Sequence, residues 1–318
     1  MELFGVGLGV AVALLWGSSD VFATLATRRL TPFKTTFISH STGLLLLLLS
    51  GITIFWFGHV SYTGEALLLS ALIGAFTGLC AALASFTFYR ALEIGPVAIT
   101  GPLTASSSAV TLILSALILK EQLTFTRRSL VVLVICGVVL ASTSLGELRL
   151  LLKKPIHMLY GPGIRWAIVA TLAFGALDFG IGASASIAGW FLPIVWMRCF
   201  SILFLTLIAC RKRQFPLPAQ ASPFSLPSLS ELVHLRQPLS RIGSGIFLAL
   251  LAGILENVAA LVFSFDTRVA TTGIASAIAS SYSLVVMVFG ILAYRERLAK
   301  NQLVGLGMVM VSLFLLAL

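Results

Sequence analysis

Apolar runs of about 20 residues recur along almost the entire chain, and they constrain its fold more than any other feature. A helix of about this length crosses the hydrocarbon core of a bilayer. A window of about 19 residues places ten such runs. They cover residues 3–26, 33–57, 66–89, 95–119, 128–146, 164–186, 188–210, 243–265, 270–292 and 301–318. The sequence therefore predicts an all-α membrane protein with ten transmembrane helices.

The composition excludes an ordinary soluble domain. Apolar residues make up 58% of the chain and charged residues only 10%, whereas roughly a quarter of a soluble domain is charged. The net charge of +10 could suggest a nucleic-acid partner. However, the basic residues border the apolar runs, as residues that set topology beside anionic headgroups do. We therefore expect a multi-pass protein of the cell (cytoplasmic) membrane, with the lipid bilayer as its partner and no nucleic acid.

Motifs that would carry catalysis or cofactor binding are absent from the sequence. There is no G-x-x-x-x-G-K-S/T phosphate loop, no H-E-x-x-H zinc motif and no G-x-S-x-G nucleophile elbow. The four cysteines lie in or beside apolar runs without a paired C-x-x-C spacing, so neither a disulfide framework nor a zinc site is indicated. We expect no cofactor, no metal, no catalytic residue and no direct drive by ATP.

An internal duplication organises the chain. Residues 15–20 (LWGSSD) align with residues 173–178 (AFGALD), 158 positions later. The same offset places His40 on Arg198.

The later part of each copy aligns at a larger offset. Residues 120–123 (KEQL) align with residues 295–298 (RERL), 175 positions later, and this offset also places Ser106 on Ser281. The change from the first offset to the second falls in the connector after the second helix of each unit, so one insertion explains it.

Two units with five spans each must enter the membrane in opposite orientations, because five is an odd number. Such inverted repeats are typical of secondary transporters, with a substrate site near the midplane between the halves. We predict one five-helix repeat at residues 1–150 and a second at 160–318. A Pro-rich basic linker at 211–242 interrupts the second repeat.

One stretch resembles a known family. Residues 91–103 (ALEIGPVAITGPL), followed by a Ser/Ala-rich helix and residues 120–124 (KEQLT), resemble the EamA-type unit of the drug/metabolite transporter superfamily. The second copy keeps residues 268–273 (RVATTG) and 295–298 (RERL) but lacks the two prolines. The resemblance implies ten helices and export of metabolites or amino acids.

Charged residues inside apolar runs are the first candidates for a site, because such residues are costly in hydrocarbon and normally face a cavity or the bundle interior. Asp20 and His40 lie about ten residues either side of one helical turn, and Asp178 and Arg198 lie similarly about the corresponding turn. We expect Arg198 to offer donors to a substrate carboxylate or phosphate, and Asp20 with His40 to form a proton-sensitive site. Alternatively, each pair only holds its helical hairpin together.

Glu256, with Asn257 beside it, lies near the middle of the eighth predicted span. The first copy has Ala81 at the corresponding position, so this acid breaks the symmetry of the duplication. Glu256 could bind a coupling proton or a cationic group of a substrate. The alternative is a protonated glutamate that bonds to a neighbouring helix.

Prolines and serines mark the fourth span. Pro96 and Pro102 remove backbone donors, which predicts an irregular start to this helix that could line a site. Serines in the fourth and ninth spans predict matching small polar faces, although small residues also allow close helix packing. Trp16 and Trp196 are candidate cavity walls, or aromatic residues that pack or face lipid. The complete set of candidate cavity residues is Trp16, Asp20, His40, Ser106, Ser107, Asp178, Trp196, Arg198, Glu256, Asn257, Ser281 and Tyr282.

Basic residues also indicate the orientation. If both termini share one side, the loops on that side hold 4 lysines and arginines, and those on the other side hold 16. The positive-inside rule then places both termini outside.

Together these features predict a carrier that is not an enzyme. We expect a secondary transporter, an exporter of small polar metabolites or amino acids, that works by alternating access. A proton or a counter-solute would drive it, and it would act as a monomer or homodimer. A membrane-embedded enzyme for lipid or isoprenoid headgroups is one alternative, although the histidines are scattered. A membrane scaffold without transport is another.

Overall fold

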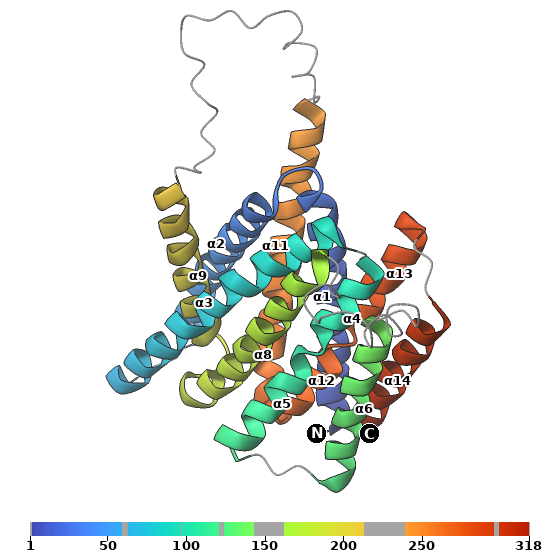
Figure 1. Cartoon of the computed structure of the whole chain (residues 1–318). Helices are drawn as coiled ribbons and strands as arrows, with labels where there is room; N and C mark the ends of the chain where they lie inside the picture. Colours follow the sequence, from blue (N-terminus) through green and yellow to red (C-terminus); the bar gives the residue numbers. More distant parts are fainter. Residues whose placement is uncertain are drawn as a thin grey trace, which may run out of the picture.

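The computed structural model describes residues 2–58, 63–95, 97–120, 124–142, 162–212, 239–295 and 299–317. All regular secondary structure in these ranges is helical (Figure 1). The helices are α1 (Glu2–Thr27), α2 (Pro32–Gly58), α3 (Gly64–Ile94), α4 (Val97–Ala105), α5 (Ser107–Ile118), α6 (Phe125–Ser142), α8 (Pro162–Ala188), α9 (Leu192–Lys212), α11 (Leu239–Val269), α12 (Thr272–Ala279), α13 (Tyr282–Tyr294) and α14 (Lys300–Ala317).

Within the described ranges, eight segments are long and apolar enough to cross a membrane. Six are the single helices α1, α2, α3, α8, α9 and α11, and the other two are the consecutive pairs α4–α5 and α12–α13. The remaining helices, α6 and α14, have 18 residues each and are not among the eight. The all-helical membrane architecture is therefore confirmed, and the count of ten spans stays a prediction.

The predicted repeat boundary and linker lie largely outside the described residues. The boundary falls between residues 150 and 160, within the undescribed range 143–161. Of the predicted linker at 211–242, only the end of α9 and the start of α11 are described.

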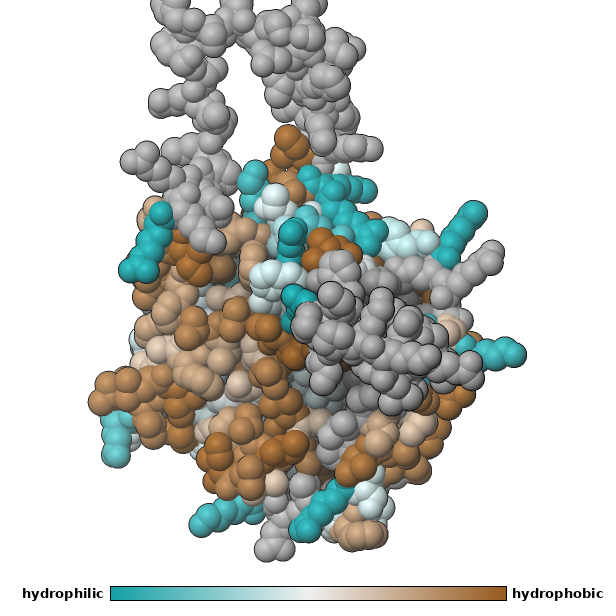
Figure 2. Space-filling model, in the orientation of Figure 1, coloured by the Kyte–Doolittle hydropathy of each residue, from teal (hydrophilic) through white to brown (hydrophobic). Residues whose placement is uncertain are grey.

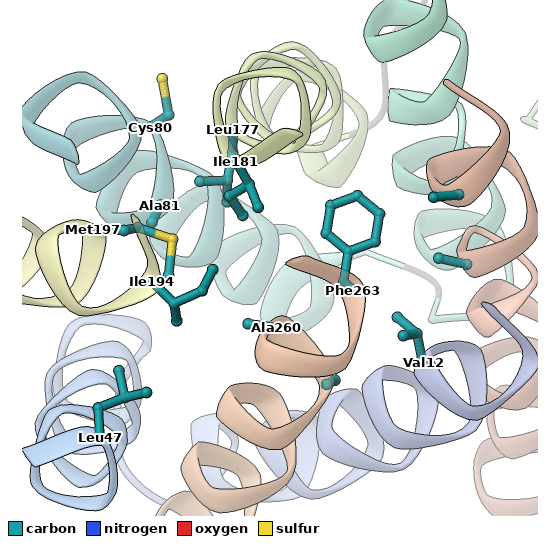
Figure 3. Packing of buried hydrophobic residues seen from close by; sticks show 13 residues of the cluster. Val12, Leu47, Cys80, Ala81, Leu177, Ile181, Ile194, Met197, Ala260 and Phe263 are labelled. Atoms are coloured by element: carbon teal, nitrogen blue, oxygen red, sulfur yellow. The ribbon is translucent and has the colours of Figure 1, made fainter. Parts of the chain in front are cut away.

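Helices from the two halves of the chain alternate in the bundle. α3 packs along α8 and α9, and in the same manner α11 packs along α1 and α2. α5 lies against α8, α13 against α1, and α6 against α14. Buried side chains of α1, α2, α3, α8, α9 and α11 converge in one apolar core cluster (Figure 3). The contact between the halves therefore runs through the centre of the molecule.

The outer surface suits a lipid environment. Many large apolar side chains are exposed, including Leu45, Leu68 and Leu117, each at least 60% accessible. Apolar side chains cover the middle of the face shown in Figure 2, and hydrophilic ones gather toward the two ends. In water a surface of this kind would bring chains together.

Two spans are broken near their middle, at serines that the second offset of the predicted duplication aligns. Ser106 follows α4 with φ −65° and ψ −4°, and Ser281 precedes α13 with φ −63° and ψ −6°. A helical ψ is about −42°, so both serines interrupt the regular hydrogen bonding. The hydroxyl of Ser106 donates to the carbonyl oxygen of Leu103 at 2.6 Å, and the hydroxyl of Ser281 donates to that of Ile278 at 2.6 Å.

The prolines predicted an irregular start to the fourth span, and the break at Ser106 is a separate feature further along it. Pro102 is inside α4, the backbone of Pro96 is outside the described residues, and the chain breaks at Ser106. In the second half Ala277 occupies the position of Pro102, and the span still breaks at Ser281. The break therefore does not require proline, and in both halves a serine hydroxyl bonds to the preceding turn at that point.

Candidate functional site

A central cavity of about 60 Å³ lies between the two halves of the chain. A single water needs about 10–15 Å³ on this measure, so the cavity has room for several waters or a small polar group. Its walls come from α1, α3, α5, α8, α9, α11 and α13. The lining residues are Trp16, Asp20, Ala81, Ser85, Phe88, Tyr89, Ser107, Phe174, Leu177, Asp178, Ile181, Met197, Arg198, Glu256, Ala260 and Tyr282.

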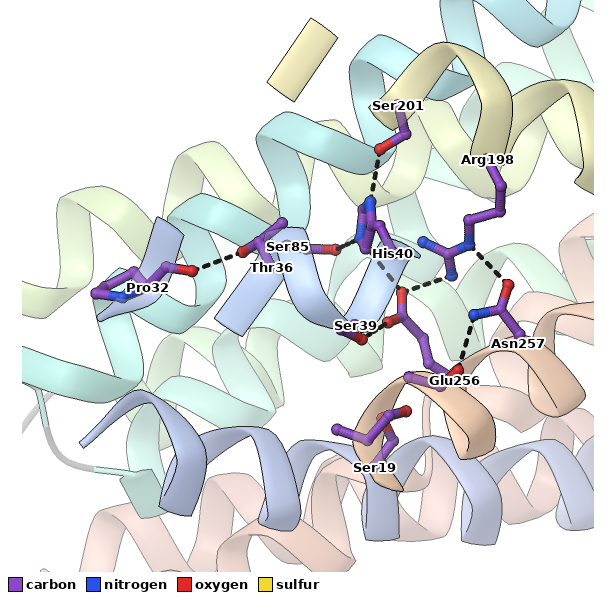
Figure 4. A network of polar contacts seen from close by, with 12 residues as sticks. Ser19, Pro32, Thr36, Ser39, His40, Ser85, Arg198, Ser201, Glu256 and Asn257 are labelled. Atoms are coloured by element: carbon purple, nitrogen blue, oxygen red, sulfur yellow. Dashed lines mark hydrogen bonds and ion pairs between the residues drawn. The ribbon is translucent and has the colours of Figure 1, made fainter. Parts of the chain in front are cut away.

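Glu256 is the centre of a network of charged and polar groups (Figure 4). Its Oε1 accepts a hydrogen bond of 2.8 Å from Nη2 of Arg198, and its Oε2 accepts one of 2.8 Å from the hydroxyl of Ser39. Nε2 of His40 lies 3.7 Å from Oε1. Glu256 is therefore paired as an ionised carboxylate would be, with donors on both oxygens.

Arg198 has one nitrogen, Nη1, that donates to no group among the described residues. Its side chain is only 2% exposed. Besides its bond to Glu256, its Nε donates to Oδ1 of Asn257 at 2.8 Å, and Nη1 has no partner among the described residues. Because a buried donor without a partner is costly, a guanidinium in the cavity wall is suited to binding an acceptor group of a ligand.

His40 is buried beside this network and does not line the cavity. Nδ1 shares a hydrogen bond of 2.5 Å with the hydroxyl of Ser201 on α9, and Nε2 shares one of 3.1 Å with Ser85 on α3. Both ring nitrogens are therefore engaged, and the ring joins α2 to two helices. Asn257, also fully buried, acts in the site by holding Arg198.

The other two acids lie in the cavity wall on different helices. Asp178 on α8 accepts a hydrogen bond of 2.8 Å at Oδ2 from the hydroxyl of Ser276 on α12. Asp20 on α1 is partly exposed and lines the cavity. No described donor bonds to its carboxylate. The site thus combines a guanidinium with two carboxyl groups that form no ion pair with a described residue.

The predicted hairpin pairs are wrong. Asp20 does not pair with His40, and Asp178 does not pair with Arg198, because His40 and Arg198 both approach Glu256. Equal depth along two helices does not make their side chains neighbours. α11 packs against α2, which carries His40, and α9, which carries Arg198, packs against α2 and also touches α11; this arrangement of three helices brings Glu256 to its two basic partners.

Aromatic rings form much of the remaining wall. The ring of Trp16 is 5.3 Å from that of Phe263 and 6.4 Å from that of Tyr282, measured between centroids. Trp196 lies elsewhere, with its Cβ against Gly74 of α3 and its ring 6.1 Å from that of Phe200. Two residues rotate a helix by about 200°, so Trp196 and Arg198 face opposite sides of α9.

Of the four candidate residues at the helix breaks, Ser107 and Tyr282 line the cavity. Ser106 and Ser281 do not, and their hydroxyls bond to their own helices. Within the described residues there is also no cluster of three or more His, Cys, Asp or Glu side chains that could hold a metal ion.

Several site residues were missed by the sequence interpretation, and the duplication could have identified some of them. Phe174 occupies the position of Trp16 at the offset of 158, and Ala81 that of Glu256 at the offset of 175; all four line the cavity. Ser39, Ser85, Ser201 and Ser276, which bond to the charged groups, carry no comparable signal, because serines are common in these helices.

Comparison with known proteins gives matches at both the sequence and fold levels. Residues 3–143 match the model of the EamA-like transporter family. An uncharacterized protein of Methanocaldococcus jannaschii is 31% identical over 137 residues, which cover 43% of this chain and 95% of the relative. One crystal structure, described only as that of a protein, superposes with a TM-score of 0.63 at 15% identity, covering 98% of this chain and 96% of the other. At that identity the likeness shows the fold alone.

Proposed function

The chain belongs to the EamA-like transporter family of the drug/metabolite transporter superfamily and is a multi-pass membrane transporter, and from this premise we propose that it exports small polar metabolites or amino acids. In this proposal it resides in the cytoplasmic membrane and moves its cargo by alternating access. An enzyme or a scaffold is not favoured, because the family is a family of transporters.

The observation that carries the proposal is the cavity between the halves with its two kinds of polar group. Arg198, which has an unpartnered Nη1 among the described residues, offers donors to a carboxylate. Asp20 and Asp178 offer acceptors to an ammonium group from other walls of the same cavity. A zwitterion such as an amino acid matches both kinds of group, and the aromatic walls provide contact for its apolar part.

Reciprocal contacts support two inverted repeats at 1–150 and 160–318. A methyl group added at Gly17 would meet Val285 at 2.6 Å and the carbonyl oxygen of Tyr282 at 3.0 Å. One added at Gly175 would meet Val110 at 2.4 Å and the carbonyl oxygen of Ser107 at 2.8 Å. The two glycines correspond at the first offset of the duplication, and the residues that they meet correspond at the second, so each half makes the same contact with the other.

Two further observations agree with this arrangement. Lys120 and Arg295, which the second offset also aligns, both have left-handed backbone angles, with φ of 55° and 52°. The Methanocaldococcus relative is less than half as long as this chain and is matched over 95% of its length. In the proposed arrangement α6 and α14 are the fifth and tenth spans, and rocking of one repeat against the other opens the cavity to alternate sides.

Transport by purified protein in lipid vesicles tests the proposal. Vesicles loaded with a panel of labelled amino acids should release the cargo faster when they contain the wild-type protein than when they contain none. R198Q and D178N should each slow release by about tenfold or more, because one hydrogen bond to a charged group contributes about 1.5–3 kcal/mol. E65Q, which changes an exposed acid at the start of α3, should transport normally. Wild-type rates from inserted R198Q and D178N proteins would refute the proposed site.

A further inference from the structure

Asp266 is a buried acid outside the central cavity. It lies near the end of α11, ten residues after Glu256, or about 15 Å along the helix, and it is not part of the cavity lining. The residue is 0% exposed. Neither carboxyl oxygen has a hydrogen-bond partner among the described residues.

Small and apolar groups enclose this carboxyl group. Oδ1 lies 3.4 Å from the point that a Cβ of Gly5 would occupy, and Oδ2 lies 3.6 Å from the corresponding point at Gly9. The methyl of Ala270 and Cγ1 of Val269 reach the same space beside Gly5, and Ile278 of α12 packs against Gly9. The acid therefore sits where α1 of the first half meets α11 and α12 of the second half.

No described charge compensates an ionised Asp266. None of the ion pairs formed among the described residues includes Asp266. Arg268, two residues later, instead directs Nη1 toward Gly189 at the turn between α8 and α9. A buried, unpaired carboxylate is costly by several kcal/mol or more. A metal ion would need several oxygen ligands, whereas the neighbours are glycines and methyl groups. A bound proton is the occupant that this environment tolerates.

The corresponding place in the first half has no acid. The second offset aligns Asp266 with Ala91, and the first offset aligns Gly5 with Gly163. A Cβ at Gly163 would meet the carbonyl oxygen of Ala91 at 3.1 Å and the Cα of Gly95 at 2.7 Å. That junction is thus closed by backbone contact between small residues. Asp266 instead meets the N-terminal part of α1 at Gly5 and Gly9, and both chain termini lie at one end of the bundle (Figure 1).

We propose that Asp266 is a proton-binding site at the end of the bundle beside the termini. There α1 separates from α11 and α12 to open a mouth and returns to close it. With its proton bound, the neutral carboxyl group allows α1 to close on α11 and α12. When the mouth opens, water reaches the group, its O–H bond breaks, the proton passes to water and a hydrated carboxylate remains. Each opening releases one proton. The ratio of open to closed protein therefore rises about tenfold per pH unit over the pH range in which opening releases that proton. The link to cargo movement rests on the proposed transport function, whereas proton binding and opening do not.

Two measurements without cargo test the site itself. Infrared spectra of wild-type protein at neutral pH should contain the carbonyl band of a protonated carboxylic acid that D266N lacks and E65Q keeps. Spin labels on cysteines introduced at Gly7, which has open space around it, and at exposed Thr271 should move apart as the pH rises. With D266N, whose amide cannot release a proton, their distance should not respond. Identical acid bands in wild-type and D266N protein, or an unchanged pH response in D266N, would overturn the proposal.

Vesicle transport then tests the coupling. The pH dependence of release should be lost in D266N and retained in E65Q. The wild type, D266N and E65Q could all fail to transport any cargo while the spectroscopic results are as expected. In that case the proposed function fails and the proton site stands. If D266N transports with the wild-type pH dependence, the coupling is refuted.

Discussion

Replacing Arg198 by methionine should destabilise the protein strongly, because it leaves Glu256 without its charged partner. Arg198 is 2% exposed and the side chain of Glu256 is 15% exposed. The change removes a charge-assisted bond of 2.8 Å and the bond to Asn257. Removal of one member of a buried ion pair costs about 3–5 kcal/mol, chiefly because the other charge stays buried. We expect a loss in this range for R198M.

The double variant R198M/E256Q should recover much of this loss. Both charges are then absent, and methionine fills most of the volume of the arginine stem, so the uncompensated charge no longer contributes. The effects of R198M and E256Q should therefore not add, and the coupling between them should be about 3 kcal/mol. Reversible unfolding by sodium dodecyl sulfate in mixed micelles, followed by circular dichroism, measures all four proteins of the cycle.

A second ion pair in the chain provides the matched control. Arg90 and Glu93 form an ion pair within α3, with side-chain exposures of 41% and 27%. Because this pair is far more accessible, R90M should cost less than about 1 kcal/mol. Additive effects of R198M and E256Q, within about 0.5 kcal/mol, would show that the buried pair is not coupled and would refute the reasoning.

Three further predictions concern packing, the histidine and the orientation. G17A and G175A should each destabilise the protein by about 1–3 kcal/mol, because the added methyl meets the facing helix. G7A should not destabilise it, because no atom lies within 4 Å of the added methyl. Unequal effects of G17A and G175A would contradict the reciprocal contact. H40L should cost about 1–3 kcal/mol in the same unfolding assay, because the hydroxyl of Ser201 loses its partner; an unchanged stability would show that this bond contributes nothing. A reporter that is active only in the cytoplasm, fused to the C-terminus, should give no signal. A bright signal would show that the C-terminus lies in the cytoplasm, opposite to the predicted orientation.

Much of the helical architecture could be predicted from the sequence. In hydrocarbon the backbone must satisfy its own hydrogen bonds, so an apolar run of sufficient length has little choice except a helix. The predicted runs at 3–26, 66–89 and 243–265 correspond to α1, α3 and α11. The candidate residues were also recognisable for a local reason, because Asp20, Asp178 and Glu256 are acids within apolar runs.

The partners of these residues could not be predicted in the same way. Depth along a helix follows from residue count, but the direction in which a side chain meets another helix depends on how all the helices pack. Glu256 meets His40 and Arg198 because α11 lies against α2 and touches α9, and nothing in the local sequence specifies those contacts. Asp266 was not among the candidates at all, since its isolation appears only when Gly5 and Gly9 of α1 enclose it.

The sequence by itself thus determined where the helices lie, which family the chain resembles and which residue types could carry charge inside the membrane. The tertiary structure alone decided that two basic groups share one acid, that a guanidinium and two carboxyl groups face the same cavity, and that a further acid has no partner among the described residues. The physical reason is the distance along the chain over which each interaction acts. Helix formation in a membrane is governed by hydropathy and hydrogen bonds within one segment. The polar partners of Glu256, by contrast, come from segments up to 217 residues away, as its bond with Ser39 shows.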